Sequence, residues 1–283
     1  MAYFIKNAGI ILILSFLVFL PQNGFAAFHV KSAMLINLTT GKILYELNPD
    51  LQVAPASLTK LMTMFLTLDE VRAGRLKMGQ PVRVSSQAAA IGGSVMRVNA
   101  GQSVPLVRLL AGTAVASGND SAMALAEKVG GNIRNFVNMM NKKASSLGMK
   151  NTRFKNPTGL PAAGQKTSAR DLWLLCAAYL ARHPEAARFH KMKNFLHKGG
   201  VTRNTNPLLG VIPGVDGLKT GWTVASGYNL IVTATRNGSR FLAIVLGATD
   251  KATRNHMATL LIQAAYRFPN SPARVRNFIA KGK

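Results

Sequence analysis

Apolar residues recur at spacings of three and four through the middle of the chain, which is the period of amphipathic helices. The clearest case is segment 57–71, whose apolar positions are Leu58, Leu61, Met62, Phe65 and Leu68. The same period predicts helices over residues 105–116, 121–129, 133–147 and 168–179, a short helix beginning at Pro184, and a closing helix over 251–268. The middle of the chain is therefore predicted to be mostly helical.

The segments that flank this helical region show strand patterns instead. Residues 30–37 and 42–46 are expected to form two strands joined by a turn at 39–41. Residues 228–235 and 241–246 are expected to form a hairpin through Asn237 and Gly238. The arrangement that satisfies both pairs is one antiparallel sheet built from both ends of the chain, with the helical region inserted between them. The predicted fold class is α/β (α+β).

The first 26 residues have the order of a secretory signal peptide. Lys6 precedes an apolar run at 8–20, and its 13 residues are fewer than the roughly 20 that a transmembrane helix needs. Pro21 follows, and the small residues Gly24 and Ala26 indicate cleavage after Ala26. A buried N-terminal helix and an uncleaved anchor are the alternatives. The prediction is export, to the periplasm or to the cell-wall side of the cytoplasmic membrane.

The charge of the chain is unusual for its otherwise ordinary composition. Its 283 residues include 35 Lys and Arg against 10 Asp and Glu, a net charge of +25, while 48% are hydrophobic. That apolar fraction is enough for a globular core. The charge predicts an anionic partner, and export makes nucleic acid an unfavoured one. The single cysteine, Cys176, excludes an intramolecular disulfide and a multi-cysteine zinc site, and we interpret it as a core residue.

Several catalytic classes lack their motifs in this chain. No HExxH sequence is present, and the five histidines have no metal-type spacing. A G-x-S-x-G sequence, a P-loop and a G-x-G-x-x-G sequence are also missing. Asp69 and Glu70 are adjacent and point to different faces of a helix, so they are a poor glycosidase pair.

One Ser-x-x-Lys sequence occurs, at Ser57 to Lys60. At the start of a helix, Lys60 lies one turn beyond Ser57 on the same face. A hydroxyl needs a base to become a nucleophile, and a lysine can serve when desolvation, nearby positive charge and a helix N-terminus lower its pKa. The backbone N–H of Ser57 could help hold an oxyanion. The alternative interpretation is an N-cap serine beside an exposed lysine.

Two further motifs could complete a site. Ser117 and Asn119 lie in a break between two helices, where a hydroxyl could relay a proton and a carboxamide could hold a substrate amide; helix capping is the alternative. Lys219, Thr220 and Gly221 precede a strand and are expected on a strand themselves. They would supply a positive charge, a donor for a carboxylate and room for a substrate backbone. The alternative is an ordinary strand with one surface lysine.

In this order, the three motifs resemble those of the penicillin-recognising serine acyltransferases. Five blocks are similar to the low-molecular-mass penicillin-binding proteins and, more narrowly, to the D-alanyl-D-alanine carboxypeptidases; they are residues 54–63, 116–120, 156–160, 167–171 and 216–223. The resemblance covers residues 28–268 and implies a β-lactamase/transpeptidase-like fold. It divides the chain into a signal peptide at 1–26, a DD-peptidase catalytic domain at 27–270 and a basic tail at 271–283.

The resemblance also implies a reaction. Ser57 would attack the carbonyl between two D-alanines of a peptidoglycan stem peptide, and Lys60 would take its proton. The terminal D-alanine would leave, protonated through Ser117, and water would hydrolyse the acyl-enzyme. Penicillin would acylate Ser57 by the same route but leave slowly. No metal or organic cofactor is implied.

Five more residues would bind the substrate if the resemblance holds. Asn119 would hold the peptide, while Lys219 and Thr220 would bind its terminal carboxylate beside Gly221. The oxyanion would lie between the N–H groups of Ser57 and Trp222. Arg254, at the start of the last helix, could add charge near the carboxylate.

Other functions stay open at this point. A DD-endopeptidase shares all three motifs. A class A β-lactamase is less favoured, because residues 153–157 hold no acid that could activate the deacylating water. An inactive module that binds cell-wall polymer is the third alternative. The surplus basic residues are expected to hold the chain on an anionic cell wall. Residues 271–283 are interpreted as a solvated tail, in preference to a weak membrane-surface contact.

Overall fold

The computed structural model describes residues 29–197 and 200–282, so the predicted signal peptide lies outside the described residues. The strands are β1 (Ser32–Asn37), β2 (Lys42–Leu47), β3 (Pro81–Arg83), β4 (Ser103–Pro105), β5 (Asn194–His197), β6 (Gly200–Arg203), β7 (Val215–Thr223), β8 (Gly227–Arg236) and β9 (Ser239–Ala248). The longer helices are α1 (Lys60–Arg72), α3 (Leu106–Val115), α4 (Asn119–Gly130), α5 (Ile133–Ser146), α6 (Ala169–Arg182), α8 (Lys251–Arg267) and α9 (Pro272–Ala280). The short ones are η1 (Ala56–Thr59), α2 (Ser86–Ala89), η2 (Pro184–Ala186) and α7 (Ala187–His190).

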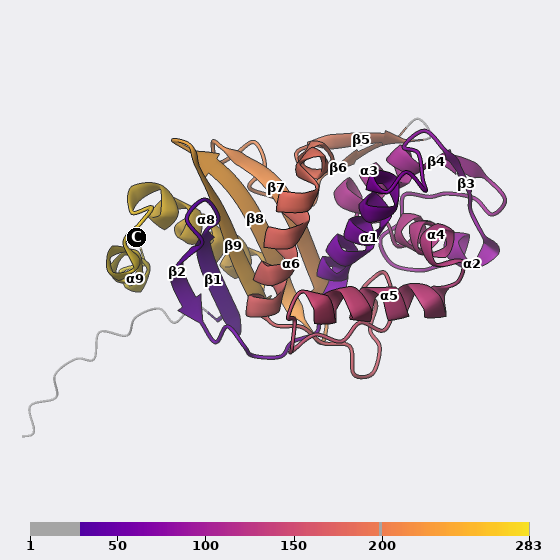
Figure 1. The fold of residues 1–283 in the computed structure, drawn as a ribbon. Coiled ribbons are helices and arrows are strands. Elements are labelled where there is room, and N and C mark those ends of the chain that lie inside the picture. Colours follow the sequence, from indigo (N-terminus) through magenta and orange to yellow (C-terminus); the bar gives the residue numbers. More distant parts are fainter. Residues whose placement is uncertain (1–28, 198–199, 283) are drawn as a thin grey trace, which may run out of the picture.

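A five-stranded antiparallel sheet joins the two ends of the described chain, in the order β2-β1-β9-β8-β7. β8 and β9 turn through Asn237 and Gly238, both at positive φ, as the hairpin pattern predicts. The helices between β2 and β7 form the inserted region; α1 to α5 lie on the right of Figure 1, while α6 lies over the sheet. The predicted sheet from both termini with an inserted helical region is therefore confirmed.

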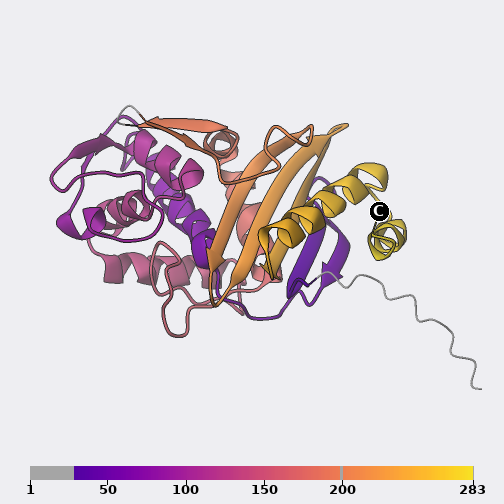
Figure 2. The same ribbon diagram turned by 180° about the vertical axis from the view of Figure 1, so that it is seen from behind.

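The sheet is covered on both faces, which explains its continuous apolar strands. Helix α6 packs against β1 and β9 in Figure 1, and α8 packs against β8 and β9 on the opposite face in Figure 2. In β9, Leu242 and Ile244 belong to one buried cluster, while Ala243 and Val245 belong to the other. This alternation follows from the two-residue period of a strand. Cys176 is buried on α6, as predicted.

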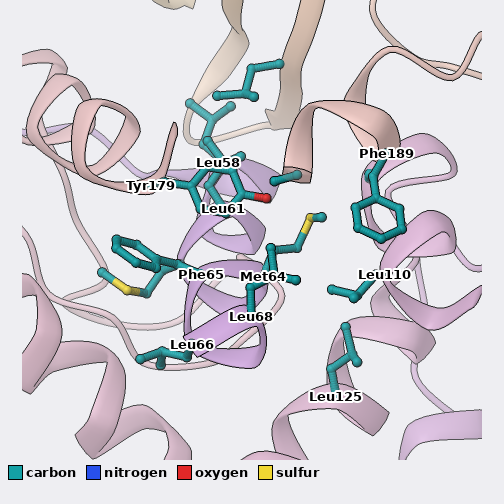
Figure 3. Close-up of a cluster of buried hydrophobic side chains, with 14 of the residues drawn as sticks. Leu58, Leu61, Met64, Phe65, Leu66, Leu68, Leu110, Leu125, Tyr179 and Phe189 are labelled. Carbon is teal, nitrogen blue, oxygen red and sulfur yellow. The ribbon is translucent and has the colours of Figure 1, made fainter. Parts of the chain in front are cut away.

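Helix α1 runs through the inserted region, and residues 60–68 are all buried. Figure 3 shows its apolar side chains pointing to several sides, towards residues of α3, α4, α6 and α7. They include Leu61, Met64 and Phe65, which belong to the larger core cluster. A helix that is buried all round holds its first turn rigidly. That first turn carries Lys60.

Three parts of the fold differ from the sequence prediction. The two-stranded sheets β3–β4 and β5–β6 were not expected. The basic tail is not a solvated segment, because α9 buries Val275, Phe278 and Ile279 against β2 and α8 while Arg274 and Arg276 stay exposed. Within the described ranges, no helix combines the length and the apolar character needed to cross a bilayer.

Candidate active site

Ser57 lies in the turn η1, and Lys60 begins the helix that follows it. Lys60 Nζ lies 2.8 Å from Ser57 Oγ, 2.7 Å from Asn119 Oδ1 and 2.7 Å from Thr158 O. The lysine side chain has no exposed surface. The predicted contact between the serine and the lysine is therefore present, and the alternative of an exposed lysine is wrong.

The environment of Lys60 favours the neutral amine. Burial and, secondarily, the charge of Lys219 lower the pKa of Lys60 well below the ordinary lysine value, against a smaller opposing effect of Asp120. A neutral amine has two N–H bonds and one lone pair. Asn119 Oδ1 and Thr158 O can only accept hydrogen bonds, so they take both N–H bonds. The lone pair then faces the hydroxyl of Ser57, which is the arrangement of a general base.

The turn at 156–160 supports this arrangement from behind. Asn156 Oδ1 accepts hydrogen bonds from the N–H groups of Thr158 at 3.2 Å and Gly159 at 2.7 Å. Gly159 has φ +84°, and a Cβ there would lie 1.7 Å from the carbonyl oxygen of Ala56. Only glycine fits this position, so the turn packs directly on the backbone that carries Ser57.

The break between α3 and α4 places the second motif on the other side of Lys60. Ser117 has a positive φ of 55° and is 5% exposed. Asn119 begins α4; its Nδ2 donates to Gly92 O at 2.6 Å while its Oδ1 accepts from Lys60. Asp120 Oδ1 accepts from Met96 N at 2.9 Å, which ties the preceding loop to the same helix start. The helix-capping alternative is thus insufficient, because Asn119 contacts the buried lysine.

Lys219 brings the third motif against the second. It lies on β7 as predicted, is 1% exposed, and donates from Nζ to Ser117 Oγ at 2.9 Å and to Thr220 O at 2.9 Å. Burial lowers the pKa of Lys219 to about 7. A Cβ on Gly221 would lie 3.1 Å from Ser57 N, so β7 runs close beside the nucleophile's backbone. The alternative of a surface lysine is wrong.

These residues surround a cavity of about 650 Å³. Ser57, Ser117, Thr220, Gly221 and Trp222 line it directly. Three of the predicted residues lie behind the lining. Lys60 reaches it through its hydrogen bond to Ser57, Lys219 through its hydrogen bond to Ser117, and Asn119 through its hydrogen bond to Lys60. The structure therefore brings all eight predicted site residues together, although their motifs are separated by about 60 and 100 residues of sequence.

The cavity is also lined by two hydroxyl residues that the sequence analysis missed and by Arg254, for which it suggested a role. Ser94 and Thr205 line the cavity, and Thr205 Oγ1 lies 2.7 Å from Thr220 Oγ1. Arg254 also lines it, is 7% exposed, and has its guanidinium hydrogen-bonded to Asn255. Burial lowers the pKa of Arg254. The sequence offered no signal for Ser94 or Thr205, while the position of Arg254 near the start of the last helix was such a signal.

The site is rich in hydroxyls and cations. Within the described part of the chain, no group of three or more His, Cys, Asp or Glu side chains is placed to hold a metal ion. The residues that line the cavity include two cations, Lys251 and Arg254, and no carboxylate among those described. The arrangement is suited to attack by an activated serine on a substrate that carries negative charge.

Comparison with known proteins is consistent with this geometry. The family model for D-alanyl-D-alanine carboxypeptidases, peptidase S11, matches residues 21–250. D-alanyl-D-alanine carboxypeptidase DacF of Bacillus subtilis is 39% identical over 257 residues, covering 89% of this chain and 66% of DacF. A D-alanyl-D-alanine endopeptidase of Pseudomonas aeruginosa is 35% identical over 238 residues, covering 81% of this chain and 75% of that relative.

Solved structures share the fold as well. Penicillin-binding protein 6B of Escherichia coli superimposes with a TM-score of 0.80 at 38% identity, covering 83% of this chain and 76% of that one. Penicillin-binding protein D2 of Listeria monocytogenes, in its ampicillin-bound form, has a TM-score of 0.72 at 32% identity, and the match covers 83% of this chain and 96% of that one. The family match spans most of the sequence, and the structure places Lys60 in contact with Ser57 and Lys219 in contact with Ser117. The chain therefore belongs to the peptidase S11 family of D-alanyl-D-alanine carboxypeptidases, among the low-molecular-mass penicillin-binding proteins.

Proposed function

We propose that this chain is a serine-type D-Ala-D-Ala carboxypeptidase, which removes the terminal D-alanine of peptidoglycan stem peptides and is acylated by penicillin. The observation that carries the proposal is the fully buried amine of Lys60, held 2.8 Å from Ser57 Oγ with its N–H bonds taken by two acceptors. A base whose lone pair already faces the nucleophile is what an acyl-enzyme mechanism requires.

The reaction follows from these contacts. Lys60 takes the proton of Ser57 as Oγ attacks the carbonyl carbon between the two D-alanines. The N–H groups of Ser57 and Trp222 hold the oxyanion, and its collapse breaks the peptide bond. The proton that Lys60 took from Ser57 passes through Ser117, which accepts a hydrogen bond from Lys219, to the leaving amine of D-alanine. Lys60 is then a neutral base again. Water then attacks the ester and restores the hydroxyl of Ser57.

Substrate binding uses the remaining residues. Thr220 and Lys219 receive the terminal carboxylate on β7, and Gly221 leaves room for the peptide backbone. Asn119 has one side-chain N–H left after its bonds to Lys60 and Gly92, and this N–H is available for a substrate carbonyl. Asn119 therefore serves both the base and the substrate.

Arg254 is a further ligand for the substrate carboxylate in this proposal. Its guanidinium is largely buried at the cavity, and the only hydrogen bonds described for it go to neutral Asn255. We expect Arg254→Ala to raise the KM for a peptide ending in D-Ala-D-Ala about 10-fold, because a charge-assisted bond is lost. The kcat should change less. Steady-state kinetics measure both, and an unchanged KM would contradict the role.

The function is tested by covalent labelling. Purified protein incubated with a fluorescent penicillin is expected to carry the label after denaturing electrophoresis, and Ser57→Ala is expected to carry none, because the nucleophilic oxygen is gone. Release of free D-alanine from a pentapeptide monomer completes the test. Failure of the unmodified protein to be labelled would contradict the enzyme proposal and favour the inactive cell-wall-binding module.

The endopeptidase is the second candidate, because the similar protein from Pseudomonas aeruginosa carries that name and this chain covers 75% of it. The two activities act on the same bond type in different contexts. A crosslinked peptide dimer offered beside the pentapeptide monomer separates them. Cleavage of the dimer without D-alanine release from the monomer would assign the chain to the endopeptidases.

Location and partners complete the proposal. We place the activity outside the cytoplasmic membrane, because the relatives named above act on D-alanyl-D-alanine and residues 1–26 have the pattern of a signal peptide. Residues 27–270 then form the catalytic domain. The net charge of +25 would hold the protein on anionic cell-wall polymer, an attraction that salt weakens.

A further inference from the structure

A buried histidine outside the cavity contacts the strand that carries Lys219. His190, at the end of α7, is 1% exposed. Its Nδ1 lies 3.1 Å from Leu218 O, and its Nε2 lies 3.0 Å from the hydroxyl of Tyr179 on α6. Tyr179 in turn packs its ring against Phe65 of α1, with ring centroids 5.6 Å apart. Figure 3 shows Tyr179 beside the start of the helix that carries Lys60.

Hydrogen-bond chemistry fixes the state of this histidine. A carbonyl oxygen only accepts, so Nδ1 must carry the hydrogen that reaches Leu218 O. The lone pair of Nε2 then accepts from the Tyr179 hydroxyl. Burial lowers the pKa of His190 to about 3, reinforced by the nearby charges of Lys219 and Arg240 and opposed by the bond to Leu218. One neutral tautomer therefore satisfies all partners at neutral pH.

The carbonyl that His190 binds is part of the peptide plane that joins Leu218 to Lys219. β7 is the edge strand of the sheet, so one of its sides has no neighbouring strand to hold it. Along the first half of β7, side chains of His190 and of the segment that follows α7 bind the backbone of this open side. Asn206 Nδ2 donates to Gly217 O at 2.7 Å, directly before the bond from His190. Asn204 Nδ2 donates to His190 O at 3.1 Å and holds the histidine in place.

We propose that His190 is a positioning residue for the reaction: its bond to Leu218 O sets the peptide plane from which Lys219 reaches Ser117 and Thr220 reaches the cavity. This inference rests on the proposed function. Lys219 Nζ makes its 2.9 Å contact with Ser117 Oγ from a side chain that is 1% exposed, so a shift of the backbone of β7 displaces this donor directly. A small rotation of this plane therefore moves both the donor to Ser117 and the Thr220 side chain that lines the cavity.

Two substitutions separate positioning from packing. In His190→Asn, the side-chain N–H₂ occupies the place of Nδ1 and can still donate to Leu218 O. In His190→Gln, the amide reaches the place of Nε2, so it can bond to Tyr179 but leaves Leu218 O without its donor. Both variants lose the ring and its packing. A purely structural role predicts similar effects from the two.

The measurement is the second-order rate constant for labelling by fluorescent penicillin, which is independent of the fraction of protein that is folded. We expect His190→Gln to lower it about 10-fold, and His190→Asn to stay within about 3-fold of the unmodified protein. Equal rate constants for the two variants, or a larger loss in His190→Asn, would overturn the inference. Labelling that fails in the unmodified protein would instead contradict the proposed function.

A second measurement needs no variant and stays informative if His190→Gln does not fold. ¹⁵N NMR of the histidine side chains reports which ring nitrogen carries the proton. We expect the His190 ring to be protonated at Nδ1 and unprotonated at Nε2 between pH 5 and 8. The opposite tautomer, with the proton on Nε2 alone, would remove the donor to Leu218 O and overturn the inference.

Discussion

Lys60→Met is expected to lower the rate at which penicillin acylates Ser57 by at least about 1,000-fold, because Lys60 is the only base found in contact with Ser57 Oγ among the described residues. The Lys60 amine faces Ser57 Oγ at 2.8 Å while Asn119 and Thr158 take its N–H bonds. Methionine matches the length of the side chain and has no basic nitrogen. The serine then keeps its hydroxyl but has nowhere to send the proton during attack.

The stability of this variant distinguishes lost chemistry from lost structure. Lys60 is fully buried, so removing its amine also removes a desolvation cost, while Asn119 Oδ1 and Thr158 O lose their donor. These effects oppose each other, and we expect a cooperative unfolding transition to remain. Lys166→Met is the matched control, because Lys166 bonds to Gln52 and does not line the cavity. Labelling of Lys60→Met at more than about a tenth of the control rate would rule out Lys60 as the base.

The chemistry of the site could be predicted from sequence because each motif is local. The spacing of Ser57 and Lys60 places them one turn apart, and the structure has them in contact. Long-range partners carry no such local signal. Thr158 O contributes a backbone oxygen from a loop; residues 156–160 were matched as a block of the resemblance, but no role was assigned to this carbonyl. Ser94 contributes a lining hydroxyl from another loop, and no pattern identifies its position. The contact of Lys219 with Ser117 joins residues that only the tertiary fold brings together.

The same distinction applies to the fold. β8 and β9 have largely continuous apolar runs, the helices α1, α3, α4, α5, α6 and α8 have apolar positions at helical spacing, and the structure confirms these elements. The hairpin β5–β6 was missed because β6 is exposed along its length and shows no alternation. In the tail, Val275, Phe278 and Ile279 have helical spacing, but four basic residues surround them. Their burial depends on β2 and α8, whose positions the sequence does not give.

Gly159 links this fold to the chemistry, and its substitution is expected to have the largest effect on stability. Its φ of +84° is unfavourable for any side chain, and a Cβ would lie 1.7 Å from Ala56 O. Neither partner can move freely, because Asn156 Oδ1 holds the turn and Ala56 leads directly into Ser57. We expect Gly159→Ala to lower the free energy of unfolding by at least about 3 kcal/mol. The displaced turn would also move Thr158 O away from Lys60.

Gly164→Ala separates the steric clash from the backbone strain. Gly164 has a similar φ of +74°, but the nearest atom to a Cβ there is Lys155 Cε at 3.6 Å. This control should therefore cost only about 1 kcal/mol, the strain of a positive φ. Denaturant titration measures both values, and penicillin labelling of the fraction that stays folded measures the effect on Lys60. Similar losses of unfolding free energy in the two variants would mean that the turn moves to accommodate a methyl group. Similar labelling rates would mean that the close packing of the turn on the backbone before Ser57 is not needed to hold Lys60 in place.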